Sequence, residues 1–238
     1  MQGRSTLTPN LGAPLKSGSL VRLIIGRIEE ALVNKELKPG DKLPPEAQLA
    51  KIMGVGKNSV REALRMLEAL GVVEVRHGDG SYIVEEPTSE SINPLVFALL
   101  IEKGSNEQIY ELRLQLEPAF TGLAAQKATE EDFARLEAMI DELAHEVEEG
   151  KSMPETDLSF HYAILEICRN PYLYRIGRAA LQLFKASIGS SMKPDPRNAV
   201  RDHRKILTAM RTRDPEKVRA AVVETLEGWK VRGLALKD

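Results

Sequence analysis

Apolar residues recur every three or four positions in two neighbouring stretches, 45–53 and 58–70, with a glycine-containing turn at 54–56 between them. This spacing is typical of amphipathic helices. Two short segments of β-like composition, 72–75 and 81–84, come next, and a glycine in the loop between them fits a tight hairpin turn. The order predicts a helix-turn-helix followed by a β-hairpin wing, an arrangement suited to reading duplex DNA.

Helical spacing also marks the segments on either side of this motif. An N-terminal helix is expected from the stripe Leu20, Leu23, Ile24, Ile28, Ala31 and Leu32. Further helices are expected at 108–127, 129–148, 157–169, 172–187, 198–211 and 215–235. Thr129 and Asp132 approximate a capping box, and Asp214 is expected to cap the last helix, with Pro215 in its first position. With about six or seven helices and no strand pattern, the second half should be an α-helical bundle.

Composition divides the chain into four parts. Residues 1–18 are rich in Gly, Ser, Thr and Pro and are interpreted as a flexible arm, and the polar stretch 87–91 as a linker. The winged helix then spans 19–86 and the helical domain 92–235. The predicted fold class is mainly α, with a small β-hairpin in the first domain, and two domains suit a length of 238 residues.

Bulk composition favours a soluble cytoplasmic protein. Charged residues make up 29% of the chain, and the longest strongly apolar run, 94–101, is far too short to cross a bilayer. The N-terminus lacks the pattern of a secretory signal. The single cysteine, Cys168, cannot form an internal disulfide, which fits a reducing compartment. We expect Cys168 to be a small buried hydrophobe, with a redox role as the alternative.

Net charge gives no support to DNA binding, since it is −2 overall and residues 1–88 carry 12 Lys and Arg against 11 Asp and Glu. Contacts must therefore be local. The residues that lie off the buried stripe of the second helix, or at the wing tip, are the candidates for DNA contact: Lys57, Asn58, Ser59, Arg61, Arg65, His77 and Gly78. Arg61 is the first choice for a guanine edge, because its fork can bond O6 and N7 together. The alternative is a surface helix with solvated charges.

The same segment resembles the winged helix of the GntR family of bacterial regulators. The matching residues are Leu37, Pro39, Gly40, Asp41, Leu43, Pro44, Glu46, Leu49, Ala50, Gly54, Val55, Val60, Arg61, Glu62, Ala63, Leu64, Leu67, Gly71, Val73, Gly78, Gly80 and Val84. The resemblance implies that all of the candidate DNA contacts named above, except Arg65, touch operator DNA. Gly56 replaces a common Ser or Thr cap, Ala47 replaces an Arg that contacts DNA in some members, and Lys57 replaces a frequent Arg.

A second group of candidates lies in the helical half. Asp157 and His161 are four residues apart and share a helix face, and His203 comes from a later helix. One carboxylate and two imidazoles can hold a divalent metal in a bundle core. The alternatives are that His161 is a satisfied core histidine and Asp157 a helix cap. Two histidines and one carboxylate also serve in non-haem iron enzymes, but no cofactor loop or acid–base pair accompanies them.

Residues 93–235 resemble the FCD domain, the helical partner of the winged helix in the FadR branch of the family. The residues that carry this resemblance are Glu111, Arg113, Leu116, Glu117, Ala124, Ala125, Asp157, Phe160, His161, Asn170, Pro171, His203, Ile206, Ala209 and Met210. Many FCD domains bind a metal through one Asp and three His. Asp157, His161 and His203 match three of these ligands, and Thr225 stands where the third His is expected. The resemblance thus implies Zn²⁺, Ni²⁺ or Mn²⁺ at an incomplete site.

The FCD resemblance also implies a ligand. Arg113 would anchor the carboxylate of a small organic or sugar acid by bidentate bonding, with Asn170 and Thr225 as further pocket residues. From the residues alone, Arg113 can equally be a surface or salt-bridged arginine. Together the two resemblances imply a homodimeric, cytoplasmic transcription regulator, not an enzyme, in which an effector changes the spacing of the recognition helices on an operator. A sensor whose only ligand is the metal is the remaining alternative.

Overall fold

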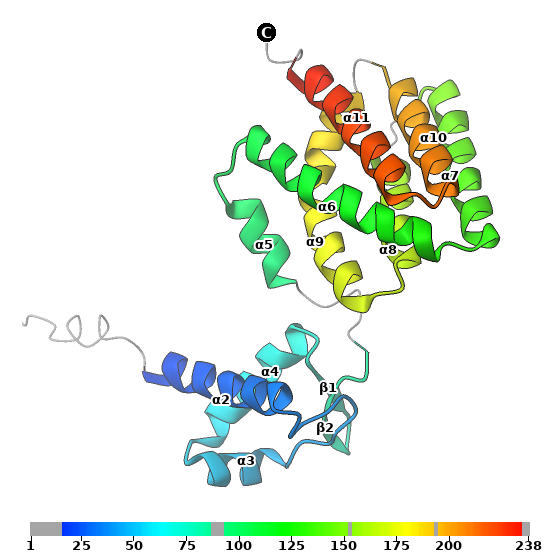
Figure 1. Ribbon diagram of the computed structural model, residues 1–238. Helices are drawn as coiled ribbons and strands as arrows, with labels where there is room; N and C mark the ends of the chain where they lie inside the picture. Colours follow the sequence, from blue (N-terminus) through cyan, green and yellow to red (C-terminus); the bar gives the residue numbers. More distant parts are fainter. Residues whose placement is uncertain (1–15, 87–92, 152–153, 193–194, 235–238) are drawn as a thin grey trace, which may run out of the picture. The chain divides into compact units, whose positions relative to one another are not determined.

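The computed structural model describes residues 16–86, 93–151, 154–192 and 195–234, which form two compact units that divide between Pro94 and Leu95 (Figure 1). Most of the expected arm and the whole expected linker, 87–91, lie outside the described residues. The first helix, however, begins at Lys16, inside the stretch that we assigned to the arm. Periodicity detects a helix only from its first core residue onward, so a preceding turn gives no signal.

The N-terminal unit is a winged helix-turn-helix, which confirms the predicted fold class. Its elements are α2 (Lys16–Val33), α3 (Glu46–Met53), α4 (Lys57–Ala69), β1 (Val73–Arg76) and β2 (Gly80–Ile83). The strands pair antiparallel, from Val73 opposite Ile83 to Arg76 opposite Gly80, and the bridge from Lys42 to Tyr82 adds a third segment to the hairpin.

The core of this unit lies between α2 and α4. The buried side chains include Val21, Ile24, Ile28, Leu43, Leu49, Val60, Ala63, Leu64, Leu67, Val73 and Ile83. The predicted stripe on α2 was wrong at Leu23, which is 66% exposed, whereas Val21 is 3% exposed. With Ile24 and Ile28 as the centre of the buried face, Val21 lies one turn below Ile24, and Leu23 falls on another side.

Two glycines set the angle between α3 and α4. Gly54 ends α3 in the left-handed conformation (φ 66°), which costs a glycine little. Gly56 occupies the cap position of α4 and offers no side chain to bond the first turn. In place of a side-chain cap, the carbonyl of Gly56 accepts the backbone N–H groups of Ser59 and Val60, at 3.1 and 3.3 Å.

The C-terminal unit is helical throughout its described residues. Its elements are α5 (Pro94–Ile101), α6 (Asn106–Lys127), α7 (Glu130–Glu148), α8 (Pro154–Ile167), α9 (Pro171–Met192), α10 (Arg197–Arg211) and α11 (Pro215–Leu234). Helix α6 packs on α11, α8 on α9, and α10 on α7 (Figure 1). Helix α5 has no buried residue. Among the described residues, no helix combines the length and apolar character that a membrane crossing needs.

Side-chain caps fix where several helices begin. Thr129 and Asp132 form the predicted capping box of α7, and Asp214 accepts the backbone N–H of Glu216 at 3.0 Å, as expected for the cap of α11. A second box, from Ser105 and Gln108, starts α6 two residues before the predicted boundary. The bundle's helix starts are therefore specified locally.

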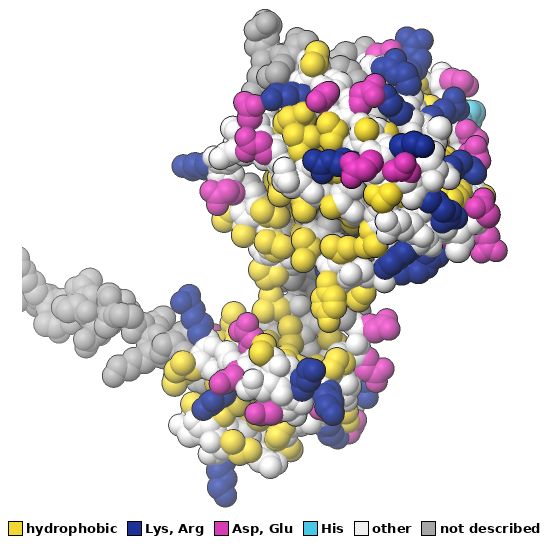
Figure 2. All heavy atoms as spheres, viewed as in Figure 1, with side chains coloured by type: hydrophobic (Ala, Val, Ile, Leu, Met, Phe, Trp, Pro, Cys, Tyr) yellow, Lys and Arg dark blue, Asp and Glu magenta, His cyan; other side chains and the backbone are white. Residues whose placement is uncertain are grey.

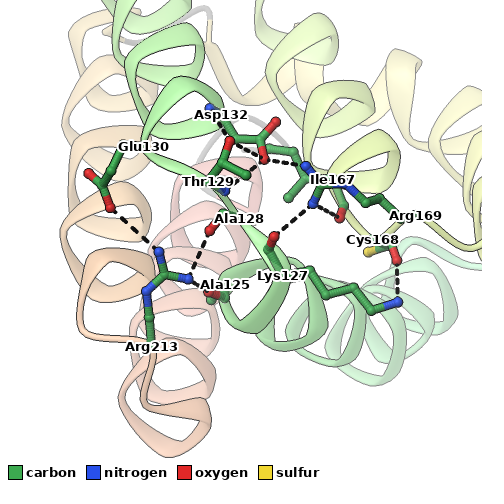
Figure 3. Close-up of polar contacts among 10 residues, drawn as sticks. All are labelled: Ala125, Lys127, Ala128, Thr129, Glu130, Asp132, Ile167, Cys168, Arg169 and Arg213. Carbon is green, nitrogen blue, oxygen red and sulfur yellow. Dashed lines mark hydrogen bonds and ion pairs between the residues drawn. The ribbon is translucent and has the colours of Figure 1, made fainter.

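The carbonyl end of α6 is held by two arginines with left-handed backbones, Arg169 (φ 44°) and Arg213 (φ 56°). Figure 3 shows both guanidinium groups turned toward this end. Arg213 donates from Nη1 to the carbonyls of Ala125 and Ala128, at 3.3 and 2.8 Å, and Arg169 donates to that of Lys127 at 2.7 Å. These bonds satisfy carbonyls that a helix end leaves without intrahelical partners.

Cys168 lies beside this junction and behaves as the expected buried residue. It is fully buried, and its thiol donates to the carbonyl of Phe120 at 3.1 Å. Burial raises the pKa of the thiol to about 11, so the reactive thiolate is scarce at neutral pH.

Helices α8 and α9 approach closely at Gly177. A methyl group at this position would lie 2.5 Å from Cδ2 of Leu165 and 2.7 Å from its Cδ1. Leu165 is itself 1% exposed, so it cannot turn outward into solvent. The absence of a side chain at Gly177 therefore sets the distance at which α8 lies against its neighbour.

Candidate functional site

The predicted DNA-contacting residues lie on two surfaces of the N-terminal unit, the first turns of α4 and the hairpin tip. Lys57, Asn58 and Arg65 are exposed, Ser59 is partly buried, and His77 and Gly78 are exposed between β1 and β2. On the face drawn in Figure 2, Lys and Arg are interspersed with Asp and Glu on the N-terminal unit as well as on the C-terminal one. This face has no broad basic field, so the candidate groups on α4 and at the hairpin tip would act on phosphates locally.

Arg61 is half exposed and already has a partner. Its Nη2 donates to Oε2 of Glu46 at 2.8 Å, and its Nε lies 3.1 and 3.2 Å from the two carboxylate oxygens. Glu46 begins α3, so the pair spans the two helices of the motif. One edge of the guanidinium is thus held by Glu46, and Nη1 takes no part in these bonds. Sequence reasoning missed this pairing because fifteen positions separate the two residues.

Polar contacts stiffen the wing. Asp79, in the hairpin loop, accepts from Nζ of Lys42 and from the hydroxyl of Tyr82, both at 2.5 Å. These bonds lower the pKa of Asp79, and the bond from Lys42 has the larger effect. The guanidinium of Arg76 lies 4.1 Å from the ring centre of Tyr82. The loop that presents His77 and Gly78 is therefore tied to its own strands and to the segment before α3.

The C-terminal unit contains a cavity of about 50 Å³ between α6, α8, α10 and α11. Its lining residues are Arg113, Glu117, Asp157, His161, Asp195, Asn198, Ala199, Asp202, His203, Ile206, Thr225, Leu226 and Trp229. A single water needs about 10–15 Å³, so the cavity has room for an ion and a few small groups. It brings Arg113 together with all three candidate metal ligands.

Asp157, His161 and His203 form one cluster at this cavity, with ligand atoms that all lie within 4.8 Å of one another. The Nε2 of His203 lies 3.3 Å from Oδ1 of Asp157, and the Nε2 of His161 lies 4.0 Å from Oδ2. Two ligand atoms about 2.0–2.2 Å from one tetrahedral ion are separated by roughly 3.3–3.6 Å. The first pair already has this separation, whereas the second, which involves the other oxygen of Asp157, is a few tenths of an ångström longer.

Burial sets the charge of the cluster. It lowers the pKa of His203 to about 3, lowers that of His161, and raises that of Asp157. The imidazoles are therefore neutral at pH 7, the form that binds metals. His203 stacks on Phe160 at 4.1 Å, and its buried Nδ1 has no hydrogen-bond partner among the described residues. An unpaired buried nitrogen is costly, and an ion bound at Nε2 would leave Nδ1 unpaired.

Arg113 is buried, at 4% exposure, rather than on the surface. Its Nε donates to Oε1 of Glu117 at 2.5 Å, and its guanidinium carbon lies 4.6 Å from the ring centre of Trp229. The Nη1 group is also buried and has no hydrogen-bond partner within the described part of the chain. The guanidinium is thus half satisfied, with donors left for an anion.

The two remaining pocket candidates differ in position. Thr225 lines the cavity, but its hydroxyl donates to the carbonyl of Val222 at 2.8 Å. Asn170 is not among the lining residues; its side chain accepts the backbone N–H of Tyr172 at 3.0 Å and caps α9. Sequence reasoning assigned no role at the site to Glu117 and Trp229, although the spacing of four between Arg113 and Glu117 was a usable signal.

Comparison with known proteins covers both units. Residues 20–83 match the family model "Bacterial regulatory proteins, gntR family", and residues 108–228 match the FCD domain. The chain is 38% identical over 140 residues to the HTH-type transcriptional regulator LutR of Bacillus subtilis, a match that covers 59% of this chain and 64% of that protein. It is 24% identical over 207 residues to the galactonate operon transcriptional repressor of Escherichia coli, covering 84% and 90%. The solved Streptococcus agalactiae GntR aligns with a TM-score of 0.59 at 25% identity, over 89% of this chain and 98% of that one.

Proposed function

The chain belongs to the gntR family of bacterial regulatory proteins and carries an FCD domain, and from this premise we propose that it regulates transcription as an effector-responsive homodimer. Residues 19–86 bind operator DNA through α4 and the wing. Residues 92–235 bind the effector and form the dimer. The relatives are transcriptional regulators, which argues against the enzyme alternative for the two histidines and the carboxylate.

The observation that carries this proposal is the shared cavity of Arg113 and the Asp-His-His cluster. A buried guanidinium with an unpaired Nη1 favours an anionic ligand, because leaving such a donor unsatisfied costs free energy. A carboxylate would accept from Arg113 at one end of the cavity and approach the cluster at the other. We therefore propose a small organic or sugar acid as effector. The galactonate operon repressor is a relative whose name refers to such an acid.

The donor set also suits a divalent metal. Two neutral imidazoles and one carboxylate can bind Zn²⁺, Ni²⁺ or Mn²⁺, and Thr225 leaves the position of a further histidine without a nitrogen ligand. A bound ion would supply positive charge and a coordination position for an effector oxygen. The protein's own residues orient the ligand: Arg113 fixes the carboxylate, and Phe160 holds the ring of His203.

Regulation then follows from differential binding. The effector binds more tightly to one arrangement of the dimer than to another, and this difference changes the spacing of the two α4 helices. An operator with two half-sites at a fixed separation responds to that spacing, because both recognition helices must reach the major groove together.

Thermal unfolding separates this proposal from its alternative. We would titrate the purified protein with Zn²⁺, Ni²⁺ or Mn²⁺ alone, with small hydroxy acids and sugar acids alone, and with both together. A rise in melting temperature with an acid that is recovered unchanged supports the proposal. Stabilisation by metal alone, with no further effect of any acid, would favour a sensor whose only ligand is the metal.

A further inference from the structure

Glu117 occupies the space between the candidate effector anchor and the candidate metal ligands. It is 2% exposed and lies one helical turn from Arg113 on α6. Its Oε1 accepts from Nε of Arg113 at 2.5 Å, and its Oε2 lies 3.9 Å from Nδ1 of His161 on α8. One buried carboxylate therefore faces both halves of the cavity.

The two nitrogens of His161 face different carboxylates. Its Nδ1 lies 3.9 Å from Oε2 of Glu117, and its Nε2 lies 4.0 Å from Oδ2 of Asp157, so either contact must shorten before a hydrogen bond forms. A neutral imidazole has one N–H and one lone pair, and an ionised carboxylate can only accept. If the hydrogen is on Nδ1, the lone pair of Nε2 is directed at the cluster and can bind an ion. If the hydrogen is on Nε2, the ring cannot bind an ion through that nitrogen.

The surroundings favour Glu117 as the acceptor with or without a metal. Asp157 lies closer to His203, at 3.3 Å, than to His161, at 4.0 Å, and it would be a ligand itself once an ion binds. Glu117 is not a candidate metal ligand. Arg113 holds its Oε1, and its Oε2 faces His161. Histidines that bind metals commonly donate their second N–H to a carboxylate, which fixes the orientation of the ring.

We propose that Glu117 is a positioning residue that fixes His161 with its hydrogen on Nδ1 and at the same time holds the Nε edge of Arg113, leaving Nη1 for a ligand carboxylate. This inference rests on the proposed function, since it gives one residue a role toward both of the ligands named there. Its consequence is that metal affinity and effector affinity depend on the same side chain.

The substitution Glu117→Gln tests this role at nearly constant volume. The carbonyl of glutamine can still accept from Arg113, while its amide group would face Nδ1 of His161 and favour hydrogen on Nε2. We expect the affinity for Zn²⁺ or Ni²⁺, measured by competition with a chelating dye, to fall about 10–100-fold. The matched control is Glu111→Gln, an exposed position on the same helix, which should leave that affinity unchanged.

A second measurement needs no variant. The ¹⁵N chemical shifts of histidine distinguish the two neutral forms of the ring, and we expect His161 of the metal-free wild type to carry hydrogen on Nδ1. Equal metal affinity in wild type and Glu117→Gln, or hydrogen on Nε2 in the wild type, would overturn the role of Glu117. If the wild type binds no ion, the metal part of the proposed function fails. The position of the hydrogen on His161 then remains as the test of whether Glu117 orients this ring.

Discussion

Arg61 illustrates how one partner changes what a side chain can do. Glu46 occupies its Nε edge, so the guanidinium is held in place before DNA arrives and presents its remaining donors in a fixed direction. Fixing a long side chain in advance reduces the entropy lost on binding. The geometry thus fits the guanine contact that the sequence predicts at this position, with Glu46 as a support.

We expect Arg61→Ala to weaken binding to a selected operator by about 1–3 kcal/mol and to relax the preference at one base pair. The reason is the loss of a directed guanidinium from the first turns of α4. Fluorescence anisotropy with a labelled duplex, chosen by selection from random sequences, measures this. Arg204→Ala, an exposed change in the C-terminal unit, is the control. Unchanged affinity and base preference in the Arg61 variant would contradict the assignment of α4 as the base-reading helix.

His203 gives the metal-free protein a pH-dependent stability. Burial lowers its pKa to about 3 from 6.5. Between these two pH values His203 is protonated in the unfolded chain and neutral in the folded one. The free energy of unfolding should therefore decrease as pH falls from the upper to the lower of these values. Asp157, whose pKa burial raises, acts in the opposite sense. Comparison of variants therefore isolates the histidine.

In chelator-treated protein, His203→Gln should reduce the slope of stability against pH between these two pKa values. The control His145→Gln, which changes an exposed histidine, should keep the wild-type slope. Urea unfolding at a series of pH values measures both. An identical slope in all three proteins would mean that His203 does not stay neutral in the fold.

At the scale of elements, the ends of helices are decided by single side chains. Arg213 has a left-handed backbone, which costs an L-residue about 1–2 kcal/mol, yet its guanidinium holds the end of α6. We expect Arg213→Ala to lower the free energy of unfolding by about 1–3 kcal/mol, because the carbonyls of Ala125 and Ala128 lose their donor.

The variant Arg213→Gly separates the two contributions. It loses the same hydrogen bonds but accepts a positive φ without strain, so it should be more stable than Arg213→Ala by about 1 kcal/mol. Urea unfolding of the two variants side by side gives the difference. A glycine variant no more stable than the alanine variant would show that the backbone at this position is not strained.

The order and type of these elements could be predicted from the sequence, because apolar spacing and capping residues act locally. The box of Thr129 and Asp132 is such a case. Leu23 was placed wrongly, because α2 carries more apolar residues than one face can bury and periodicity alone does not choose among them. Asn170 was assigned to the pocket by resemblance, whereas its side chain caps α9. Partners distant in sequence, such as Glu46 and Arg61, become visible only in the fold.

At the scale of the whole molecule, regulation requires that the two units respond to the same ligand. Arg113→Ala should leave operator affinity unchanged but abolish the change that an effector acid produces, because the proposed anchor lies in the C-terminal unit, whereas all candidate DNA contacts lie in the N-terminal unit. Arg113→Lys, which keeps the charge without the fork, should respond more weakly than wild type. Anisotropy with the selected duplex and increasing acid measures the response. A normal response in the alanine variant would rule out Arg113 as the anchor.

The close approach at Gly177 has a consequence for how this sequence can vary. Helix α8 carries both Asp157 and His161, and a methyl group on α9 would press on it through Leu165. In a saturation mutagenesis survey scored by reporter expression, position 177 should tolerate only glycine, although it is neither a candidate DNA contact nor part of the cavity lining. If substitutions at position 177 abolish regulation, the cause would be the distance between α8 and α9, because Gly177 itself contributes no side chain to binding.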